Sequence, residues 1–125
     1  MVLAPHPDDE SLGCGALLAR AFAGAGAHVI CLTDGCASHP RSRLWPPERL
    51  AALRQQEMAR AIECLGGTTG DLTWLGLADA ELYRANASAV ATRLEQVIDT
   101  AGAPCLCTCR RGPPRGSQSH CAFRK

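Results

Sequence analysis

The chain has 125 residues, a formal net charge of +1 and 4% aromatic residues. This length predicts about one domain, and the nearly neutral charge creates no field that would attract nucleic acid or an anionic membrane surface. Aromatic side chains are too scarce for a base-stacking platform. Residues 21–33 are the most apolar stretch and are too short to span a bilayer. The chain also becomes polar too early for a signal peptide. Composition therefore predicts a cytoplasmic protein with no membrane span and no nucleic-acid partner.

A loop rich in ligand-type side chains follows the first apolar segment. Residues 2–4 predict a short strand, residues 12–23 predict an amphipathic helix, and Pro5-His6-Pro7-Asp8-Asp9-Glu10 lies between them. In open α/β sheets, loops at the carboxyl ends of strands bind ligands. The prolines on either side of His6 restrict the backbone, so this loop would lose little further freedom on binding a metal.

The side chains of this loop suit metal-assisted hydrolysis. The His6 imidazole and the Asp9 carboxylate are ligand types for zinc. Of two adjacent carboxylates, one can bind a metal while the other accepts a proton from a metal-bound water. As the alternative, Asp8, Asp9 and Glu10 form an acidic first turn for the next helix. That alternative explains neither His6 nor the prolines.

The remaining segments alternate between strand and helix patterns. Residues 28–33 and 71–75 predict buried strands, and residues 48–65 and 85–101 predict amphipathic helices. Asp34-Gly35 follows the second strand, where it could hold the first loop, contact substrate or form a plain turn. His28 lies at the opposite end of that strand and predicts a structural or surface role. We expect His39 to be an exposed loop residue.

Several of these segments together resemble the PIG-L/LmbE-like deacetylases. Residues 4–10 with Gly13-Cys14-Gly15 resemble the signature of that family, and Thr33-Asp34-Gly35 resembles its Thr-Asp-Gly. Residues 53–57 resemble its Arg-x-x-Glu helix, and residues 75–79 resemble its third strand-exit loop. The resemblance implies an α/β, Rossmann-like three-layer fold with a mostly parallel sheet, incomplete at the C-terminus.

The same resemblance implies a reaction and a set of site residues. The family removes acetyl groups from N-acetylglucosaminyl and related small amides with Zn²⁺. Carried over by position, His6 and Asp9 become zinc ligands, Asp8 the general base, and Arg54 and Asp79 substrate-binding residues. Without the resemblance, Arg54 and Glu57 at i, i+3 would be interpreted as a solvated ion pair, and Asp79 as a turn residue.

The last 22 residues depart from the family pattern. We expect residues 1–103 to form a partial deacetylase domain and residues 104–125 to form an aberrant, disordered tail rich in Cys, Pro and Arg. Pro113-Pro114 argues against a central strand there, and the family's second histidine-bearing loop, which supplies a third zinc ligand, is missing. A frameshift near Arg110-Arg111 would explain this tail. The alternatives are a metal site at Cys105, Cys107, Cys109 and His120-Cys121, or a basic nucleic-acid-binding arm.

Two functions follow from the sequence. The first is a zinc-dependent deacetylase of small N-acetylated sugars, with weak zinc binding and little activity because one ligand is missing. The second is an inactive relic or a binding module with the same fold. A nucleotide-binding loop at Gly13 and Gly15 is disfavoured, because the preceding acids would repel a pyrophosphate and Leu18 replaces the third glycine of that fingerprint.

Overall fold

The computed structural model describes residues 1–38, 42, 44–79, 86–102, 106–108 and 122–124. Its elements, in chain order, are β1 (Val2–Ala4), α1 (Asp9–Phe22), β2 (Val29–Thr33), a 3₁₀ turn η1 (Cys36–Ser38), α2 (Pro47–Cys64), a second 3₁₀ turn η2 (Thr69–Asp71), β3 (Leu72–Leu77), α3 (Ala87–Ala101), β4 (Leu106–Thr108) and β5 (Ala122–Arg124). Strands and helices alternate up to α3, as the sequence pattern predicts.

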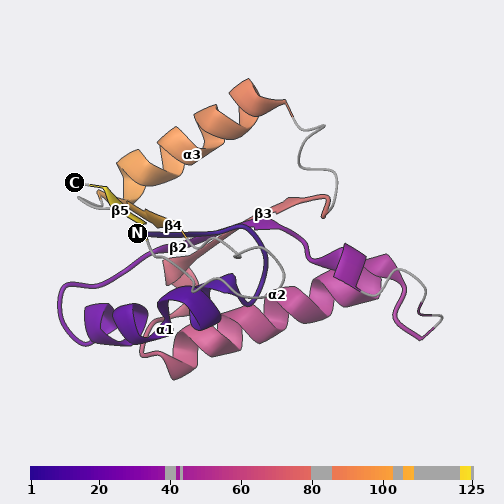
Figure 1. Cartoon of the computed structure of the whole chain (residues 1–125), viewed down its shortest axis with the longest axis horizontal. Helices are drawn as coiled ribbons and strands as arrows, with labels where there is room; N and C mark the ends of the chain where they lie inside the picture. Colours follow the sequence, from indigo (N-terminus) through magenta and orange to yellow (C-terminus); the bar gives the residue numbers. More distant parts are fainter. Residues whose placement is uncertain (39–41, 43, 80–85, 103–105, 109–121, 125) are drawn as a thin grey trace.

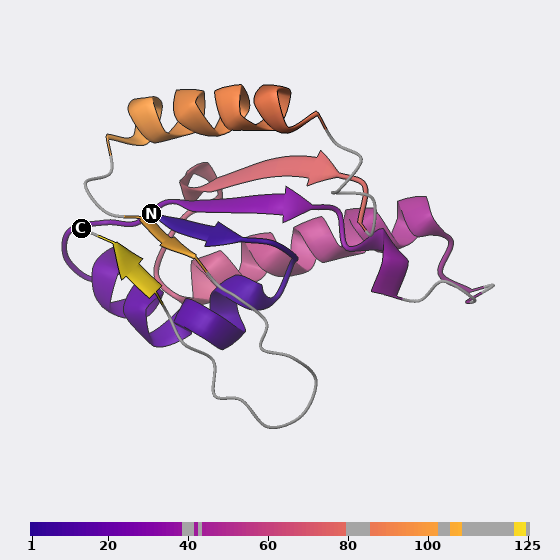
Figure 2. The same cartoon turned by 45° about the horizontal axis from the view of Figure 1, so that its top comes forward.

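The strands form one sheet in the order β3-β2-β1-β4-β5. β1, β2, β3 and β4 pair in parallel, and β5 pairs antiparallel to β4. Figures 1 and 2 show α1 and α2 on one face of this sheet and α3 on the other. The predicted α/β fold with three layers and a mostly parallel sheet is therefore confirmed.

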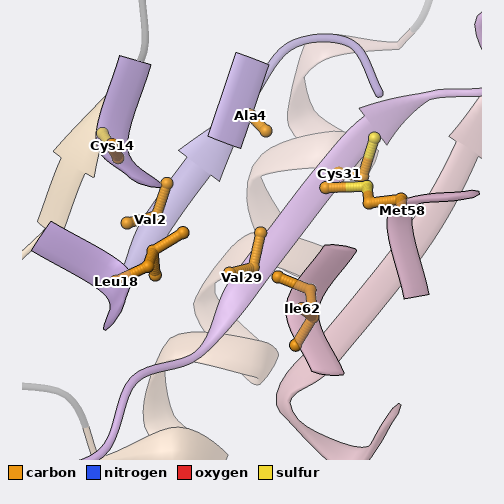
Figure 3. Packing of buried hydrophobic residues seen from close by; sticks show 8 residues of the cluster. All are labelled: Val2, Ala4, Cys14, Leu18, Val29, Cys31, Met58 and Ile62. Atoms are coloured by element: carbon orange, nitrogen blue, oxygen red, sulfur yellow. The ribbon is translucent and has the colours of Figure 1, made fainter. Parts of the chain in front are cut away.

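The hydrophobic core lies between the sheet and the α1–α2 layer. Val2 and Ala4 of β1 are buried while Leu3 between them is half-buried, as expected when alternate strand residues face opposite sides. Leu18 of α1 and Ile62 of α2 pack against this face (Figure 3). The complete buried cluster consists of Val2, Ala4, Cys14, Leu18, Val29, Cys31, Met58 and Ile62.

The layer formed by α3 is less deeply packed. The helix begins with a cap in which the Asn86 side chain accepts hydrogen bonds from the N–H groups of Ser88 and Ala89, a common way to satisfy free N–H groups. It ends at Gly102, which has a positive φ. None of the α3 residues is buried. A cavity of about 390 Å³ lies between α3 and the residues His28 and Thr73.

The helices begin close to their predicted starts, with one instructive shift. α1 begins at Asp9, three residues before the expected start, so Asp9 and Glu10 occupy its first turn. Carboxylates are favourable there because the N–H groups of the first turn carry partial positive charge. The Asp8 side chain makes no capping hydrogen bond. The capping interpretation is therefore correct for the helix dipole but not for Asp8.

The C-terminal segment differs from the expected disordered tail. β4 pairs with β1 at Val2↔Cys107 and Leu3↔Thr108, and β5 pairs with β4. Residues 106–108 and 122–124 are therefore strands within a tail that the sequence led us to expect to be disordered. The physical reason is that the free edge of β1 offers N–H and C=O groups that a short segment can pair with. The division at residue 103 stays a prediction, and Pro113, Pro114 and His120 lie outside the described residues.

Candidate active site

The loop after β1 is attached to the end of β2 at the carboxyl edge of the sheet. The Pro5 carbonyl accepts hydrogen bonds from the Thr33 backbone N–H at 3.2 Å and from Thr33 Oγ1 at 2.8 Å. Thr33 is buried. Its hydroxyl and amide therefore fix the point at which the loop containing His6 and Asp8 leaves the sheet.

Asp8 has an unusual backbone conformation that a buried carboxylate supports. Among the described residues it is the one non-glycine with a positive φ, at 109°. Such a conformation costs about 1–3 kcal/mol and persists when neighbouring groups enforce it. Here Glu10 Oε2 accepts the Asp8 N–H at 3.0 Å, and Glu10 Oε1 accepts the Ser11 hydroxyl at 2.6 Å. Since Glu10 is 1% exposed, its contacts hold the Asp8 backbone in place.

The His6 ring lies between two carboxylates. Its Nδ1 is 3.3 Å from Asp9 Oδ2 and its Nε2 is 3.3 Å from Asp79 Oδ1. The His6 backbone N–H also donates to Asp9 Oδ2 at 3.0 Å. A neutral imidazole carries one N–H, so it can donate to one of these carboxylates. The nitrogen lone pair on the other side faces an anion unless a proton or a metal cation lies there.

Asp34 connects the loops that follow β2 and β3. Its Oδ1 accepts the backbone N–H of Cys36 at 3.1 Å and that of Asp79 at 3.1 Å. Of the roles that the sequence left open, loop anchoring is therefore present, although the anchored loop is the one after β3. Burial, followed by the hydrogen bond to Asp34, raises the pKa of the Cys36 thiol.

These loops enclose a cavity of about 300 Å³. The residues that line it include His6, Asp8, Gly35, Arg54 and Asp79. Asp9 lies behind His6 and is 5% exposed. The structure thus brings the five residues predicted for catalysis, metal binding and substrate binding to one corner of the molecule, four of them on the cavity wall.

Arg54 forms part of the boundary between this cavity and a second one. Its Nη1 donates to Glu57 Oε2 at 3.0 Å, as the i, i+3 spacing predicts. The second cavity, of about 220 Å³, also has Pro7, Asp8 and Arg54 in its wall and extends between α1 and α2 to Leu12 and Met58. Arg54 therefore lines both spaces while it makes a partly exposed ion pair with Glu57.

The donor set matches part of a zinc site. Histidine nitrogen and carboxylate oxygen are ordinary zinc ligands, and a catalytic zinc usually has three protein ligands. Within the described parts of the chain, no group of three His, Cys, Asp or Glu side chains could hold a metal ion. His6 and Asp9 are of the ligand types that zinc takes, and His6 Nδ1 lies 3.3 Å from Asp9 Oδ2. His39, His120, Cys105, Cys109 and Cys121 lie outside those parts, and Cys107 lies in β4.

His28 lies at the opposite edge of the sheet, as predicted. Its Nε2 is 2.8 Å from Thr73 Oγ1, whereas both ring nitrogens of His6 lie beside carboxylates. Burial lowers the pKa of His28 despite the opposing charge of Asp71. These surroundings are those expected of a histidine with a structural role.

Two functional contacts were not predicted from the sequence. The hydrogen bond that the Asp8 N–H donates to Glu10 depends on the positive φ of Asp8, for which the sequence offers no signal. The hydrogen bond that the Asp79 N–H donates to Asp34 joins residues 45 positions apart. The signal that could have suggested it is the position of both residues directly after neighbouring parallel strands.

Comparisons with known proteins identify the family to which this chain is similar. The family model described as PIG-L, GlcNAc-PI de-N-acetylase, matches residues 1–125. A 1D-myo-inositol 2-acetamido-2-deoxy-alpha-D-glucopyranoside deacetylase from Kineococcus radiotolerans is 42% identical over 84 residues, which are 63% of this chain and 22% of that protein. The structure of an N,N'-diacetylchitobiose deacetylase from Pyrococcus horikoshii, in complex with an inhibitor, matches with a TM-score of 0.67 and 27% identity. That match covers 80% of this chain and 36% of the other. The chain thus spans about a fifth to a third of the length of these relatives.

No helix in the described part of the chain combines the length and the apolar character that crossing a membrane requires.

Proposed function

Because the chain belongs to the PIG-L family of de-N-acetylases, we propose that its carboxyl-edge cavity hydrolyses the N-acetyl group of an N-acetylglucosamine-type sugar. The observation that supports this most directly is that His6, Asp8, Arg54 and Asp79 line one cavity, with Asp9 against the His6 ring. The two relatives are both named as deacetylases of acetamido sugars. The cytoplasmic location expected from the sequence stays a prediction.

In this proposal His6 and Asp9 hold a divalent metal, with Zn²⁺ as the first candidate. Such a metal, when bound, polarises an acetyl carbonyl and lowers the pKa of a water molecule. The buried position of Asp9 and its hydrogen bond from the His6 N–H orient this carboxylate towards the imidazole. Both ligands then come from one short segment whose backbone the prolines restrict.

Asp8 acts as the general base and then as the general acid. It takes a proton as the water oxygen bonds to the acetyl carbon, and it returns that proton to the nitrogen as the C–N bond breaks, which gives acetate and the free amine. The hydrogen bond that the Asp8 backbone N–H donates to Glu10 holds the backbone from which this carboxylate extends. Arg54 and Asp79 bind the polar groups of the sugar from the other walls of the cavity.

One observation favours the alternative of a binding module without chemistry. Among the described residues no group of three His, Cys, Asp or Glu side chains could hold a metal ion, whereas a catalytic zinc usually has three protein ligands. Without a third ligand the metal would bind weakly, and sugar binding at Arg54 and Asp79 could persist without hydrolysis. For this chain we therefore expect weak zinc binding and slow hydrolysis.

The test combines zinc titration with an assay for free amine. Calorimetric titration of the full chain should show one weak Zn²⁺ site that loses at least tenfold in affinity in His6→Ala. His28→Ala is the matched control, because that histidine lies at the other edge of the sheet, and it should leave the affinity unchanged. Release of amine from N,N'-diacetylchitobiose, dependent on zinc, would support the enzyme.

Three outcomes separate the hypotheses. Equal zinc affinity in the wild type and His6→Ala would contradict the assigned metal site. Zinc binding at His6 with sugar binding but no amine at any zinc concentration would favour the binding module. Amine release that His6→Ala does not reduce would place the chemistry elsewhere.

A further inference from the structure

The short segment Thr33-Asp34-Gly35, here called the 33–35 bridge, contacts both of the other loops at the carboxyl edge. Thr33 donates twice to the Pro5 carbonyl at the start of the loop after β1. Gly35 has a φ of +66°, and a Cβ added there would lie 3.1 Å from the Pro7 ring carbons. The bridge therefore lies directly against the residues on either side of His6.

Asp34 makes the contact to the other loop, the one that leaves β3. Its backbone N–H donates to the Leu77 carbonyl at 2.9 Å, and its Oδ1 accepts the Asp79 N–H at 3.1 Å. The same oxygen accepts the Cys36 N–H at 3.1 Å, which closes a local turn. One carboxylate oxygen thus joins a local turn to a residue 45 positions later in the chain.

The Asp79 side chain continues this connection across the cavity. Its Oδ1 is 3.3 Å from His6 Nε2, and its side chain is 12% exposed. The Asp79 backbone is therefore held by Asp34 while its carboxylate faces His6. A shift of the Asp79 backbone would change the distance between the Asp79 carboxylate and the His6 ring.

We propose that Asp34 is a positioning residue for the deacetylation proposed above: it fixes the Asp79 backbone and thereby sets where Asp79 presents its carboxylate to substrate beside His6. This inference rests on the proposed function for the identity of the substrate. The placement of Asp79 by Asp34 does not depend on the proposed function. Asp34 itself does not line the cavity described above, so it acts through neighbours that do, and of these Asp79 is the one whose carboxylate faces His6.

A plain turn residue would behave differently. The bond from Asp34 Oδ1 to the Cys36 N–H is the i, i+2 contact that aspartate makes in ordinary turns. If that were its whole role, removing the carboxylate would affect Cys36 and leave Asp79 as it was. The Asp79 N–H is therefore the group to observe.

Residue-resolved amide hydrogen exchange on the full chain tests the placement without substrate or metal. In Asp34→Ala we expect exchange at Cys36 and at Asp79 to accelerate at least tenfold beyond any change at Ile62, a buried reference in α2. In Asp34→Asn the side-chain oxygen remains an acceptor, and exchange at both amides should stay within threefold of the wild type. Unchanged exchange at Asp79 in Asp34→Ala would overturn the inference.

Kinetics then test the consequence for substrate. Asp34→Ala should raise KM for an N-acetylglucosamine substrate at least tenfold with a smaller change in kcat, and Asp34→Asn should restore both. A uniform fall in kcat in both variants, with KM unchanged, would contradict the positioning role. If Asp34→Ala does not fold, Asp34→Glu, which keeps the charge but moves the oxygen by one methylene, should give the same exchange and KM results.

The two proposals fail separately. A wild-type chain that releases no amine would overturn the proposed function, while exchange at Asp79 would still decide whether Asp34 places that residue. Conversely, an active chain with unaltered Asp79 exchange in Asp34→Ala would overturn the positioning role alone.

Discussion

The two edges of the parallel sheet each contain a histidine, and their surroundings differ. At the carboxyl edge, His6 lies between Asp9 and Asp79 beside a cavity. At the amino edge, His28 contacts the Thr73 hydroxyl. The same side chain is thus surrounded by anions at one edge and held by a neutral hydroxyl at the other. The difference arises because the loops that leave the parallel strands converge at the carboxyl edge and bring acidic side chains together there.

The largest expected effect distinguishes the carboxylates of the two edges. Asp8→Asn should lower kcat/KM for deacetylation about 10²–10⁴-fold, the usual contribution of a general base. Asparagine tolerates positive φ better than most residues, so the loop should keep its conformation. Activity is measured as amine release at saturating zinc.

The matched control for Asp8 lies at the amino edge. Asp71 precedes β3 and accepts the Thr68 N–H at 2.8 Å. Asp71→Asn should leave kcat/KM within about twofold, because Asp71 is remote from the cavity. Equal losses in the two variants would show that general effects of charge or stability, and not the carboxyl edge, control the activity.

A smaller effect concerns the tight contact between the loops. Gly35→Ala would place a Cβ at positive φ and 3.1 Å from Pro7, and we expect it to lower the free energy of unfolding by about 1–2 kcal/mol. Gly15→Ala in α1 has no atom within 4 Å of the added Cβ. It should raise stability by about 0.5–1 kcal/mol, because alanine is a better helix former.

Urea unfolding of both glycine variants measures these values. Changes of opposite sign in the free energy of unfolding would show that the backbone at the carboxyl edge is constrained while the surface of α1 is not. A stabilising Gly35→Ala would mean that the loop after β2 can move away from Pro7.

The smallest effect concerns the amino edge and its pH dependence. Burial lowers the pKa of His28 in the folded chain below the unfolded value of 6.5. The unfolded chain therefore binds the proton more readily, so stability is lost as the pH falls through and below about 6.5. The melting temperature should fall less between pH 7.5 and pH 5.5 in His28→Gln than in the wild type.

Thr73→Val is the control for that measurement. It removes the hydroxyl partner but keeps the imidazole, so it should lower the melting temperature while retaining most of the pH dependence. Identical losses in the wild type and His28→Gln would assign the acid sensitivity to other groups.

The sequence predicted those features that depend on local patterns. Strand β1, the helix order and the convergence of His6, Asp8 and Asp79 at one edge follow from hydrophobic runs and from the rule that parallel strands end together. The Glu10 contact could not be predicted, because it depends on the backbone angle at Asp8. The β4 pairing was also missed, since it depends on the free edge of β1 and not on a strong strand pattern in residues 106–108.

The shallow packing of α3 has a consequence for how the chain unfolds. None of its residues is buried, and a cavity of about 390 Å³ lies beneath its C-terminal half. A helix with so little contact can separate from the sheet at a free-energy cost below that of global unfolding. We therefore expect this chain to denature in two stages, in which α3 separates from the sheet first and the sheet with α1 and α2 unfolds afterwards. A two-state treatment would then understate the free energy of unfolding of the part that contains His6.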